Sequence, residues 1–205
     1  MRPVITVVVL LCFAGLVTNA NQDVPPWDEY AKTARFIVHQ ALWCSLTTIS
    51  ANVTMKGQPF TVPTSVSDGP VKNGTGVPYF YHAKIGTVYI DVLQNNKVTL
   101  SFSEAQFGMD ECMTTTSTDP EWPLCARLSL IGQMQILSDP KEIATAKAAV
   151  FSRPPSMMSW GGQLSFVFMM FEISRILLVD FFGGWKEISV KDYFNAQENN
   201  GIMTE

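Results

Sequence analysis

The chain has 205 residues, of which 47% are hydrophobic and 16% are charged. This length is enough for one sizeable core and short for two, so we expect a single domain. The formal net charge is −4 and no run of basic residues interrupts the sequence. A mildly acidic surface of this kind argues against partners that are nucleic acids or anionic lipids.

The first twenty residues have the composition of a secretory signal peptide. Arg2 precedes an apolar run from Val4 to Val17, and Thr18-Asn19-Ala20 supplies small residues for cleavage. An uncleaved membrane anchor is the alternative, but the run is shorter than the ~18 to 20 apolar residues that a span needs. We therefore expect residues 1–20 to be removed and residues 21–205 to form a secreted domain.

The mature chain opens with a segment that has the periodicity of a helix. Between Trp27 and Leu46, apolar residues recur at spacings of three and four, which places them on one helical face. These residues are Ala31, Ala34, Ile37, Val38, Ala41 and Leu42. Two segments rich in β-branched residues follow, Ser45 to Val53 and Pro59 to Val66, and Lys56-Gly57-Gln58 between them predicts a turn.

The middle of the chain alternates between loops and strands. A Gly- and Pro-rich loop is expected from Asp68 to Gly76, followed by an aromatic strand from Tyr79 to Tyr81. The segment from Thr87 to Leu93 fits either a strand or a short helix. Apolar and polar residues then alternate from Val98 to Ser103, which predicts a half-buried strand.

The last third begins with alternating residues from Ala126 to Leu130, and Gly132 suggests a bulge or bend. Asp139-Pro140 has the chemistry of a helix start, with a capping carboxylate and proline at the first helical position. We expect that helix to run to about Phe151. Two further strands, Leu164 to Ile173 and Ile176 to Phe182, precede a last short helix that begins at Ser189.

The long apolar stretch from Leu164 to Phe182 also has the length of a membrane span. It contains Glu172, Arg175 and Asp180, however, and each such charge costs about 2.5 to 3.5 kcal/mol near the centre of a membrane helix. We therefore expect no membrane span after the signal is cleaved. Many strands with a few helices between and beside them predict an antiparallel barrel of the α+β class.

Three cysteines remain in the mature chain, and a secreted protein meets an oxidising compartment. Cys44 lies among Ala41, Leu42, Trp43 and Leu46, so we expect it to be buried as a small hydrophobic residue. Cys112 and Cys125 enclose a segment rich in Thr, Ser, Asp and Pro, and we predict that they form a disulfide. An odd number of cysteines leaves one free thiol or one intermolecular bridge.

Two sequons agree with the secretory route. Asn52-Val53-Thr54 and Asn73-Gly74-Thr75 both lack proline in the middle, so Asn52 and Asn73 are predicted glycosylation sites. Glycine and proline around Asn73 favour an exposed loop there.

Several short blocks resemble, in order and spacing, the CREG glycoproteins. The central block is Ser65-Val66-Ser67-Asp68-Gly69-Pro70 followed by Gly74-Thr75-Gly76-Val77-Pro78-Tyr79-Phe80-Tyr81. Further matching segments are Ala34-Arg35-Phe36, Thr48-Ile49-Ser50, Leu93-Gln94-Asn95-Asn96, Thr99-Leu100, Pro123-Leu124-Cys125 and Asp180-Phe181-Phe182-Gly183-Gly184. Together they cover about residues 27 to 196.

This resemblance implies a six-stranded antiparallel split β-barrel of the FMN-binding type, a homodimer, and secretion with partial delivery to lysosomes. It also implies binding to the mannose-6-phosphate/IGF-II receptor and a role in restraining growth and promoting differentiation. Related split barrels bind FMN at the dimer interface. In the CREG branch a loop is thought to fill that space, and Trp122, Pro123 and Leu124 resemble that loop here, as a pocket-blocking or partner-binding segment.

Two functions therefore compete: a non-catalytic receptor-binding protein, and an FMN-dependent oxidoreductase. The FMN phosphate requires cations, backbone amides or a helix N-terminus. The strand from Pro59 to Val66 supplies hydroxyls but no cation, and Lys72, Lys84 and Arg127 fit better as surface charges. We thus expect no FMN and no catalytic residues.

Other catalytic or metal chemistry finds little support. His39 and His82 are the only histidines, too few for a convincing metal site. On a continuous helix, His39 and Cys44 would lie on different faces, which argues against a Cys-His pair. Asp68 beside Gly69 is interpreted as a turn residue.

Overall fold

The computed structural model describes residues 24–108, 112, 119–153, 155–160, 164–180 and 184–196. The predicted signal peptide, residues 1–20, lies outside these residues. Within the described chain, no helix combines the length and apolar character that crossing a bilayer requires.

Seven strands form one antiparallel sheet. They are β1 (Trp43–Ile49), β2 (Pro59–Ser65), β3 (Tyr79–Ala83), β4 (Lys97–Ser103), β5 (Arg127–Ile136), β6 (Phe166–Val179) and β7 (Lys186–Ile188). The order along the sheet is β2-β1-β4-β5-β6-β3, and β7 pairs with β6 away from this path. The predicted α+β class and six-stranded antiparallel split barrel are thereby confirmed, with β7 as a short addition.

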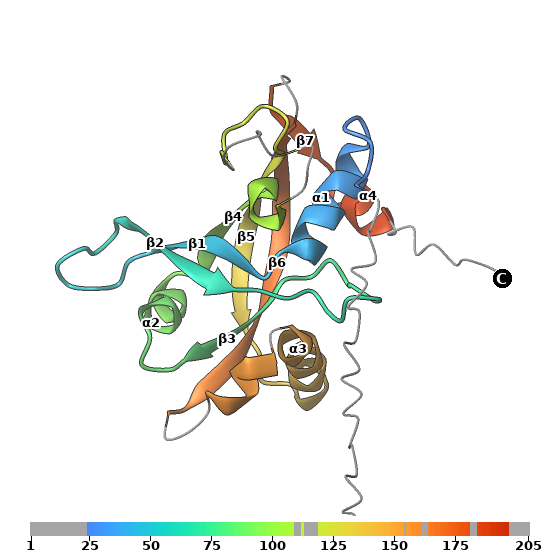
Figure 1. Cartoon of the computed structure of the whole chain (residues 1–205). Helices are drawn as coiled ribbons and strands as arrows, with labels where there is room; N and C mark the ends of the chain where they lie inside the picture. The colour runs from blue at the N-terminus through green and yellow to red at the C-terminus, as the bar shows by residue number, and fades with distance from the viewer. Residues whose placement is uncertain are drawn as a thin grey trace, which may run out of the picture.

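Within the described residues, four α-helices and the 3-10 helices η1 and η3 accompany the sheet. They are α1 (Tyr30–Gln40), α2 (Thr87–Gln94), α3 (Pro140–Ser152), α4 (Val190–Asn195), η1 (Glu104–Phe107) and η3 (Pro155–Ser159). In Figure 1, α1, α3 and α4 lie to one side of the long β6, whereas α2 lies beside β2 and β3 on the other. The segment from Thr87, which periodicity left open, is a helix.

The first helix is shorter than the prediction. It ends at Gln40, and the residues from Trp43 onward form β1, in which buried and more exposed positions alternate. The β-branched run of Thr47, Thr48 and Ile49 and the pairing with β2 outweigh the helical spacing of the residues before it. Cys44 is therefore on a strand, so the helical-face argument that separated it from His39 was wrong. Its predicted burial is confirmed, because the thiol is free and buried.

The two strands expected between Leu164 and Phe182 are one strand, β6, of 14 residues. Glu172 and Arg175, two of the charges that argued against a membrane span, occupy exposed positions of this strand, and Ser174 is an extra residue between the pairs Ile131–Arg175 and Gly132–Ile173. This bulge confirms the irregularity expected at Gly132. A Cβ at Gly132 would lie 2.0 Å from the Glu172 carbonyl oxygen, which explains why only glycine fits the close approach.

The start of α3 is as predicted. The Asp139 side chain accepts hydrogen bonds from the backbone N–H groups of Lys141 and Glu142, at 2.9 and 3.1 Å, and Pro140 occupies the first turn. These contacts satisfy N–H groups that have no partner within the helix. The helix ends at Ser152, one residue beyond the expected end.

Two apolar clusters hold the sheet and helices together. The larger one fills the barrel and includes Phe80, Leu100 and Leu130, whereas the smaller one lies between α3 and β3 and includes Tyr79 and Val150. Consecutive residues of β3 thus face different clusters, as side chains of a strand must. Both faces of β3 are therefore covered by apolar side chains. This packing holds β3, an end strand of the sheet, in position.

Candidate functional site

The two end strands of the sheet, β2 and β3, approach each other without forming a ladder. Ser67 and Tyr79 make an isolated bridge, with backbone N···O distances of 3.3 and 2.9 Å. Beyond that bridge, the side chains of Thr64 and His82 are the contact that spans the gap: Thr64 Oγ1 lies 3.4 Å from His82 Nε2. Pro63 has no N–H, so β2 lacks a donor there for a strand that could close the gap. This gap is the split of the barrel.

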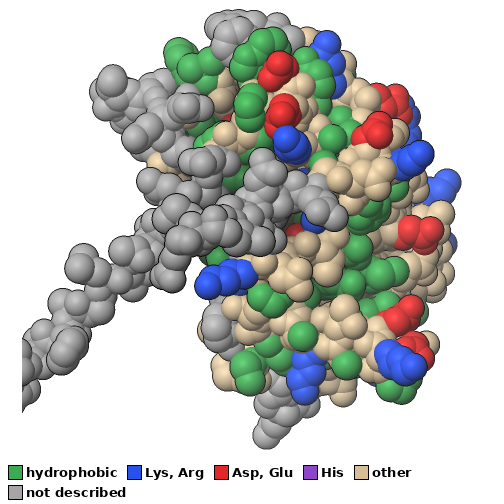
Figure 2. Space-filling view, turned by 90° about the vertical axis from the view of Figure 1, so that its right-hand side faces the viewer, with side chains coloured by type: hydrophobic (Ala, Val, Ile, Leu, Met, Phe, Trp, Pro, Cys, Tyr) green, Lys and Arg blue, Asp and Glu red, His purple; other side chains and the backbone are tan. Residues whose placement is uncertain are grey.

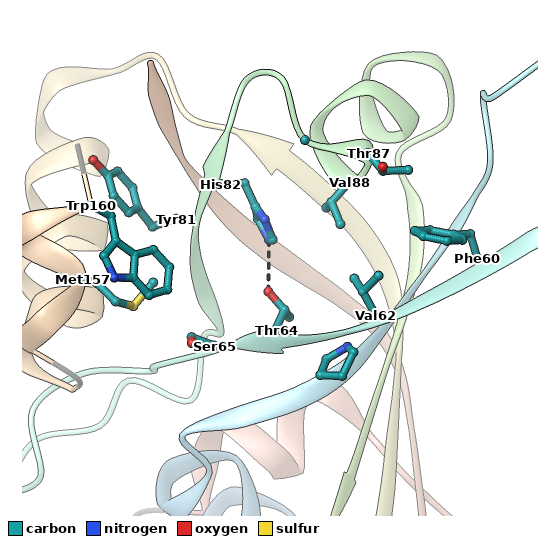
Figure 3. Close-up of a pocket in the computed structure, with 12 residues that line it drawn as sticks. Phe60, Val62, Thr64, Ser65, Tyr81, His82, Thr87, Val88, Met157 and Trp160 are labelled. Carbon is teal, nitrogen blue, oxygen red and sulfur yellow. Dashed lines mark hydrogen bonds between the residues drawn. The ribbon is translucent and has the colours of Figure 1, made fainter. Parts of the chain in front are cut away.

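A pocket of about 340 Å³ lies at the split. Its lining residues come from β2, β3, the start of α2 and η3: Phe60, Val62, Pro63, Thr64, Ser65, Tyr81, His82, Gly86, Thr87, Val88, Met157 and Trp160. Figure 3 shows Phe60, Val62 and Val88 on one side of the Thr64–His82 contact, and Tyr81, Met157 and Trp160 on the other. The volume is at the lower end of the range for ligand pockets.

The pocket carries no formal charge. None of its lining residues is Lys, Arg, Asp or Glu. Burial lowers the pKa of His82 to about 4, so its imidazole is neutral at ordinary pH. The polar side chains that remain are this imidazole and the hydroxyls of Thr64, Ser65, Thr87 and Tyr81. Gly86, Thr87 and Val88 also bring the first turn of α2 to the pocket, and the N–H groups of this turn have no side-chain cap.

Aromatic packing fixes one wall of the pocket. The Tyr81 ring stacks on Phe166 and Phe168, with centroids 4.6 and 4.7 Å apart, and meets Phe151 edge-on at 5.3 Å. Such contacts between β3, β6 and α3 hold the tyrosine in one place. Trp160 completes this side and is 47% exposed, so it borders the pocket where solvent can enter.

Sequence reasoning missed a buried polar network behind the split. Asp68 and His39 are both fully buried, and Asp68 Oδ1 lies 2.8 Å from His39 Nδ1 and 2.9 Å from Arg153 Nη2. The other carboxylate oxygen accepts the N–H of Gly76 at 3.0 Å. Asp68 therefore joins α1, the end of α3 and its own loop, a role well beyond that of a turn residue.

The glycines of the same loop make close contacts with α1. The Arg35 guanidinium donates to the carbonyls of Thr75 and Gly74, at 2.6 and 3.1 Å. Gly76 has φ +76°, and a Cβ there would lie 1.7 Å from Arg35 Nη1. The Gly74-Thr75-Gly76 segment thus binds Arg35 of its own chain. This contact explains the two glycines without a bound phosphate.

The predicted glycosylation sites are both exposed. Asn52 is in the turn between β1 and β2, where its Oδ1 accepts the N–H and the hydroxyl of Thr54 at 3.0 and 2.8 Å. Asn73 is in the loop between β2 and β3, and its N–H donates to the Pro70 carbonyl. Neither residue lines the pocket, and glycosylation of both stays a prediction.

The loop before β5 is held by the predicted disulfide, since Cys112 and Cys125 are bonded and buried. Trp122 and Leu124 are 37% and 38% exposed, and Pro123 is half-buried. None of these three residues lines the pocket of its own chain. Blocking of the pocket therefore requires the loop of a second subunit, and the role of Trp122 to Leu124 stays a prediction.

The three basic residues considered for phosphate do not meet at the pocket. Lys72 is exposed in the loop after Asp68, Lys84 is exposed after β3, and Arg127 begins β5. None of them is among the lining residues. In the part of the chain that the structure describes, no group of three or more His, Cys, Asp or Glu residues could hold a metal ion.

Comparison with known proteins identifies the family. The family model described as "CREG, beta-barrel" matches residues 25–195. The chain belongs to the CREG family. It is 34% identical to Protein CREG1 of Gallus gallus over 191 residues, covering 91% of this chain and 96% of that protein. It is 39% identical to human Protein CREG2 over 166 residues, covering 81% of this chain and 56% of that protein.

Solved structures extend the likeness of this CREG chain at the level of fold. A heme binding protein from Mycobacterium smegmatis superposes with a TM-score of 0.64 over 83% of this chain and 61% of that one. Sequence identity is 16%, so the likeness concerns the split barrel alone.

The residues of this CREG chain do not fit FMN within one subunit. FMN carries a phosphate of about −1.5 to −2 charge, which needs paired cations or converging donors when it is buried. The pocket at the split offers hydroxyls, a neutral histidine, apolar walls and the first turn of α2, but no cation.

Proposed function

We propose that this CREG protein is a secreted, non-catalytic glycoprotein that acts as a homodimer and binds a receptor to regulate growth and differentiation. The observation that carries this proposal is the uncharged pocket at the split of a flavin-type barrel. Within one subunit, the pocket supplies no cation for the phosphate of a flavin nucleotide, which favours a role other than redox catalysis. The rigid scaffold is then available for recognition of a partner.

Two features support passage through the secretory pathway. The disulfide between Cys112 and Cys125 suits an oxidising compartment. Both sequon asparagines are exposed, so glycans can project from them without disturbing the core. Acidic and basic side chains are interspersed on the face shown in Figure 2, which agrees with the small net charge of the chain. We expect the mature protein outside the cell and, by receptor uptake, in lysosomes.

Two parts of the surface are candidates for receptor contact. The glycans at Asn52 and Asn73 would be recognised by the mannose-6-phosphate/IGF-II receptor if they carry mannose-6-phosphate. The loop held by the disulfide presents Trp122, and a large aromatic side chain on a constrained loop loses little entropy on binding. Receptor binding through the glycans requires mannose-6-phosphate, whereas binding through the Trp122 loop does not.

The test uses the full chain secreted from mammalian cells. Intact mass gives glycan occupancy, light scattering gives the oligomeric state, and binding is measured to the immobilised receptor with and without free mannose-6-phosphate. Asn52→Gln and Asn73→Gln should weaken the sugar-dependent part. Trp122→Ala should weaken the remainder, whereas Ile85→Ala, at an isoleucine that is 73% exposed and follows β3 at the opposite end of β6, should not. A monomer with no receptor binding in any form would contradict the proposal.

The oxidoreductase alternative is tested on the same preparation. After incubation with excess FMN and desalting, the absorption spectrum of the dimer should show no flavin. Flavin retained at one molecule per subunit would mean that the dimer completes a phosphate site that the single chain lacks, and the protein would then be assigned as an FMN-dependent enzyme.

A further inference from the structure

The loop between β2 and β3 is held by a histidine that uses both of its ring nitrogens. His39 of α1 is fully buried, with Nδ1 2.8 Å from Asp68 Oδ1 and Nε2 2.9 Å from the carbonyl oxygen of Val71. Figure 1 shows this loop running between α1 and α3. The two atoms that face the ring are a carboxylate oxygen and a carbonyl oxygen, and both accept hydrogen bonds without donating any.

Two donated hydrogen bonds need two protons on the ring. A neutral imidazole has one N–H group and one bare nitrogen, whereas the imidazolium ion has two N–H groups. In a neutral ring, the lone pair of one nitrogen would face an oxygen lone pair at hydrogen-bond distance. His39 and Asp68 are both 0% exposed, so solvent does not relieve such a contact. The observed geometry is therefore that of an imidazolium ion.

The alternative places the second proton on Asp68 instead of His39. The contacts of this carboxyl group argue against it, because Oδ1 also accepts from Arg153 Nη2 at 2.9 Å and Oδ2 accepts the Gly76 N–H at 3.0 Å. A proton on Asp68 would thus face donors on every side. Arg153 Nη2 lies 3.4 Å from His39 Nδ1, too far to replace the proton between two atoms 2.8 Å apart.

The charges around the network bear on how firmly the second proton is held. The carboxylate favours a positive ring, whereas the two arginines oppose one, so the proton remains removable within the ordinary range of a histidine. The tyrosines are neutral, since burial raises the pKa of one and the other donates its proton to the Gly76 carbonyl. The groups that face the network are Asp68, Arg153, Arg35 one turn earlier on α1, Tyr79 of β3 and Tyr193 of α4, and Lys72 is exposed in the same loop.

We infer that His39 is a proton-dependent latch on the loop between β2 and β3, closed at acidic pH and released as the pH rises. A ring that loses one proton keeps the N–H that faces Asp68, because a hydrogen bond to a charged group is the stronger one. The bare Nε2 then faces the Val71 carbonyl, and this contact opens. Val71 is 58% exposed, so its carbonyl can turn to solvent.

The latch acts on the part of the loop that carries the Asn73 sequon. The Asn73 N–H donates to the carbonyl of Pro70, next to Val71, so release of Val71 frees the segment before the sequon. A loop held at acidic pH and loosened at neutral pH would differ between lysosomes and the exterior of the cell. The latch goes beyond the proposed function, because it requires neither a receptor nor a glycan.

The first test counts the protons on the ring. The full chain is secreted by cells supplied with histidine labelled with 15N in the ring, and His82→Gln assigns the two histidines of the sequence. We expect both nitrogens of His39 to have the chemical shifts of an imidazolium ion at pH 5. At pH 8 we expect a protonated Nδ1 and a bare Nε2.

The second test measures the loop itself. Hydrogen exchange of peptides from residues 68–76 is followed by mass spectrometry at pH 5.5 and 7.5 and corrected for the intrinsic effect of pH. Because opening releases one proton, protection should fall by up to about tenfold for each pH unit once the ring has lost its second proton. Peptides of β4 should show no such change.

Two matched variants assign the effect to one histidine. His39→Gln removes the group that titrates, so the corrected exchange of its loop should not depend on pH. His82→Gln makes the same change at the histidine of β3, and its loop should respond as in the unaltered protein. Local exchange is the suitable readout, because His82 is neutral when folded and acts on overall stability with the opposite sign.

Each possible failure has a clear meaning. A single proton on the His39 ring at pH 5 would overturn the inference, and two protons retained at pH 9 would make the contact permanent and exclude a switch. Equal corrected exchange on both sides of the titration would show that the proton does not hold the loop. The spectra and exchange of the unaltered protein decide these points even if His39→Gln does not fold, and none of them affects the receptor-binding proposal.

Discussion

His39 and Asp68 lie side by side in the interior of the protein, with Nδ1 of the imidazole 2.8 Å from Oδ1 of the carboxylate. One is on α1 and the other is in the loop between β2 and β3. Arg153, at the end of α3, donates to the same carboxylate oxygen at 2.9 Å. The Asp68 carboxylate therefore connects α1, the end of α3 and the loop between β2 and β3.

Loss of that carboxylate should therefore be costly. Asp68→Ala leaves the Gly76 N–H without its acceptor and removes the carboxylate that pairs with Arg153, whose guanidinium still donates to the carbonyls of Gly69 and His39. Breaking a buried pair in this way costs about 3 to 5 kcal/mol. Urea unfolding measures the change in the free energy of unfolding. Asp139→Ala, at an exposed helix cap, should cost only about 1 kcal/mol. If the two variants lost similar amounts of unfolding free energy, the buried network around Asp68 would contribute no more to stability than an exposed helix cap.

Two glycines with the same backbone conformation provide a second test. Gly57 and Gly76 have φ of +81° and +76°, but a Cβ at Gly57 meets nothing within 4 Å, whereas one at Gly76 overlaps Arg35. Gly57→Ala should cost about 1 kcal/mol, the strain of a left-handed alanine. Gly76→Ala should cost clearly more, because the guanidinium must also leave its carbonyl partners. Equal thermal melting temperatures for the two variants would contradict this account.

The neutral histidine of the pocket predicts a dependence of stability on pH. The pKa of His82 falls from its usual value of 6.5 to about 4 on folding, so the unfolded chain binds one more proton between these values. The contribution of His82 to the free energy of unfolding is complete above pH 6.5 and is lost as the pH falls toward 4. From pH 6.5 to 5 we expect a loss of up to about 2 kcal/mol, reduced by partial exposure of the side chain.

The variant His82→Gln isolates this effect from other groups that titrate. Urea unfolding at pH 7, 6 and 5 should show a shallower decline for the variant than for the unaltered protein. Parallel declines would mean that His82 takes a proton as readily in the folded state as in the unfolded one.

The disulfide should contribute stability under oxidising conditions. Replacing Cys112 and Cys125 together by serine should lower the free energy of unfolding by about 3 kcal/mol, the value expected for a loop of this size. Cys44→Ser is a poor control because that thiol is buried, so Ser129→Ala on β5 is preferable. A double variant as stable as the unaltered protein would show that the loop is held by other contacts.

Strands and helix ends that depend on neighbouring residues could be predicted from the sequence, whereas the pocket and the buried network could not. Alternation in β4 and the cap at Asp139 depend on neighbours in sequence, and both appear in the structure as expected. The role of Asp68 depends on partners 29 and 85 residues away, which no local pattern reveals. The signal that could have indicated it was a carboxylate within a Gly- and Pro-rich segment, with arginines elsewhere in the chain that lack nearby acids.

The errors have the same origin. Residues after Gln40 continue the helical spacing of α1, but pairing with β2 makes them a strand. Two strands were expected between Leu164 and Phe182, yet a bulge at Ser174 lets one strand continue past Gly132. The pocket was missed because its walls come from β2, β3, α2 and η3, which are separate in sequence and meet only in the folded chain.

The Tyr193 hydroxyl of α4 donates to the carbonyl of Gly76 at 2.7 Å, and its ring lies under the Arg35 guanidinium at 5.4 Å. Helix α4 thus contacts the loop between β2 and β3 across 117 residues of sequence. A nascent chain cannot make this contact before α4 has left the ribosome, so the domain reaches its native state only after that point. A premature stop codon shortly before Tyr193 should consequently yield a chain that is retained and degraded during biosynthesis, although it lacks little of the barrel itself.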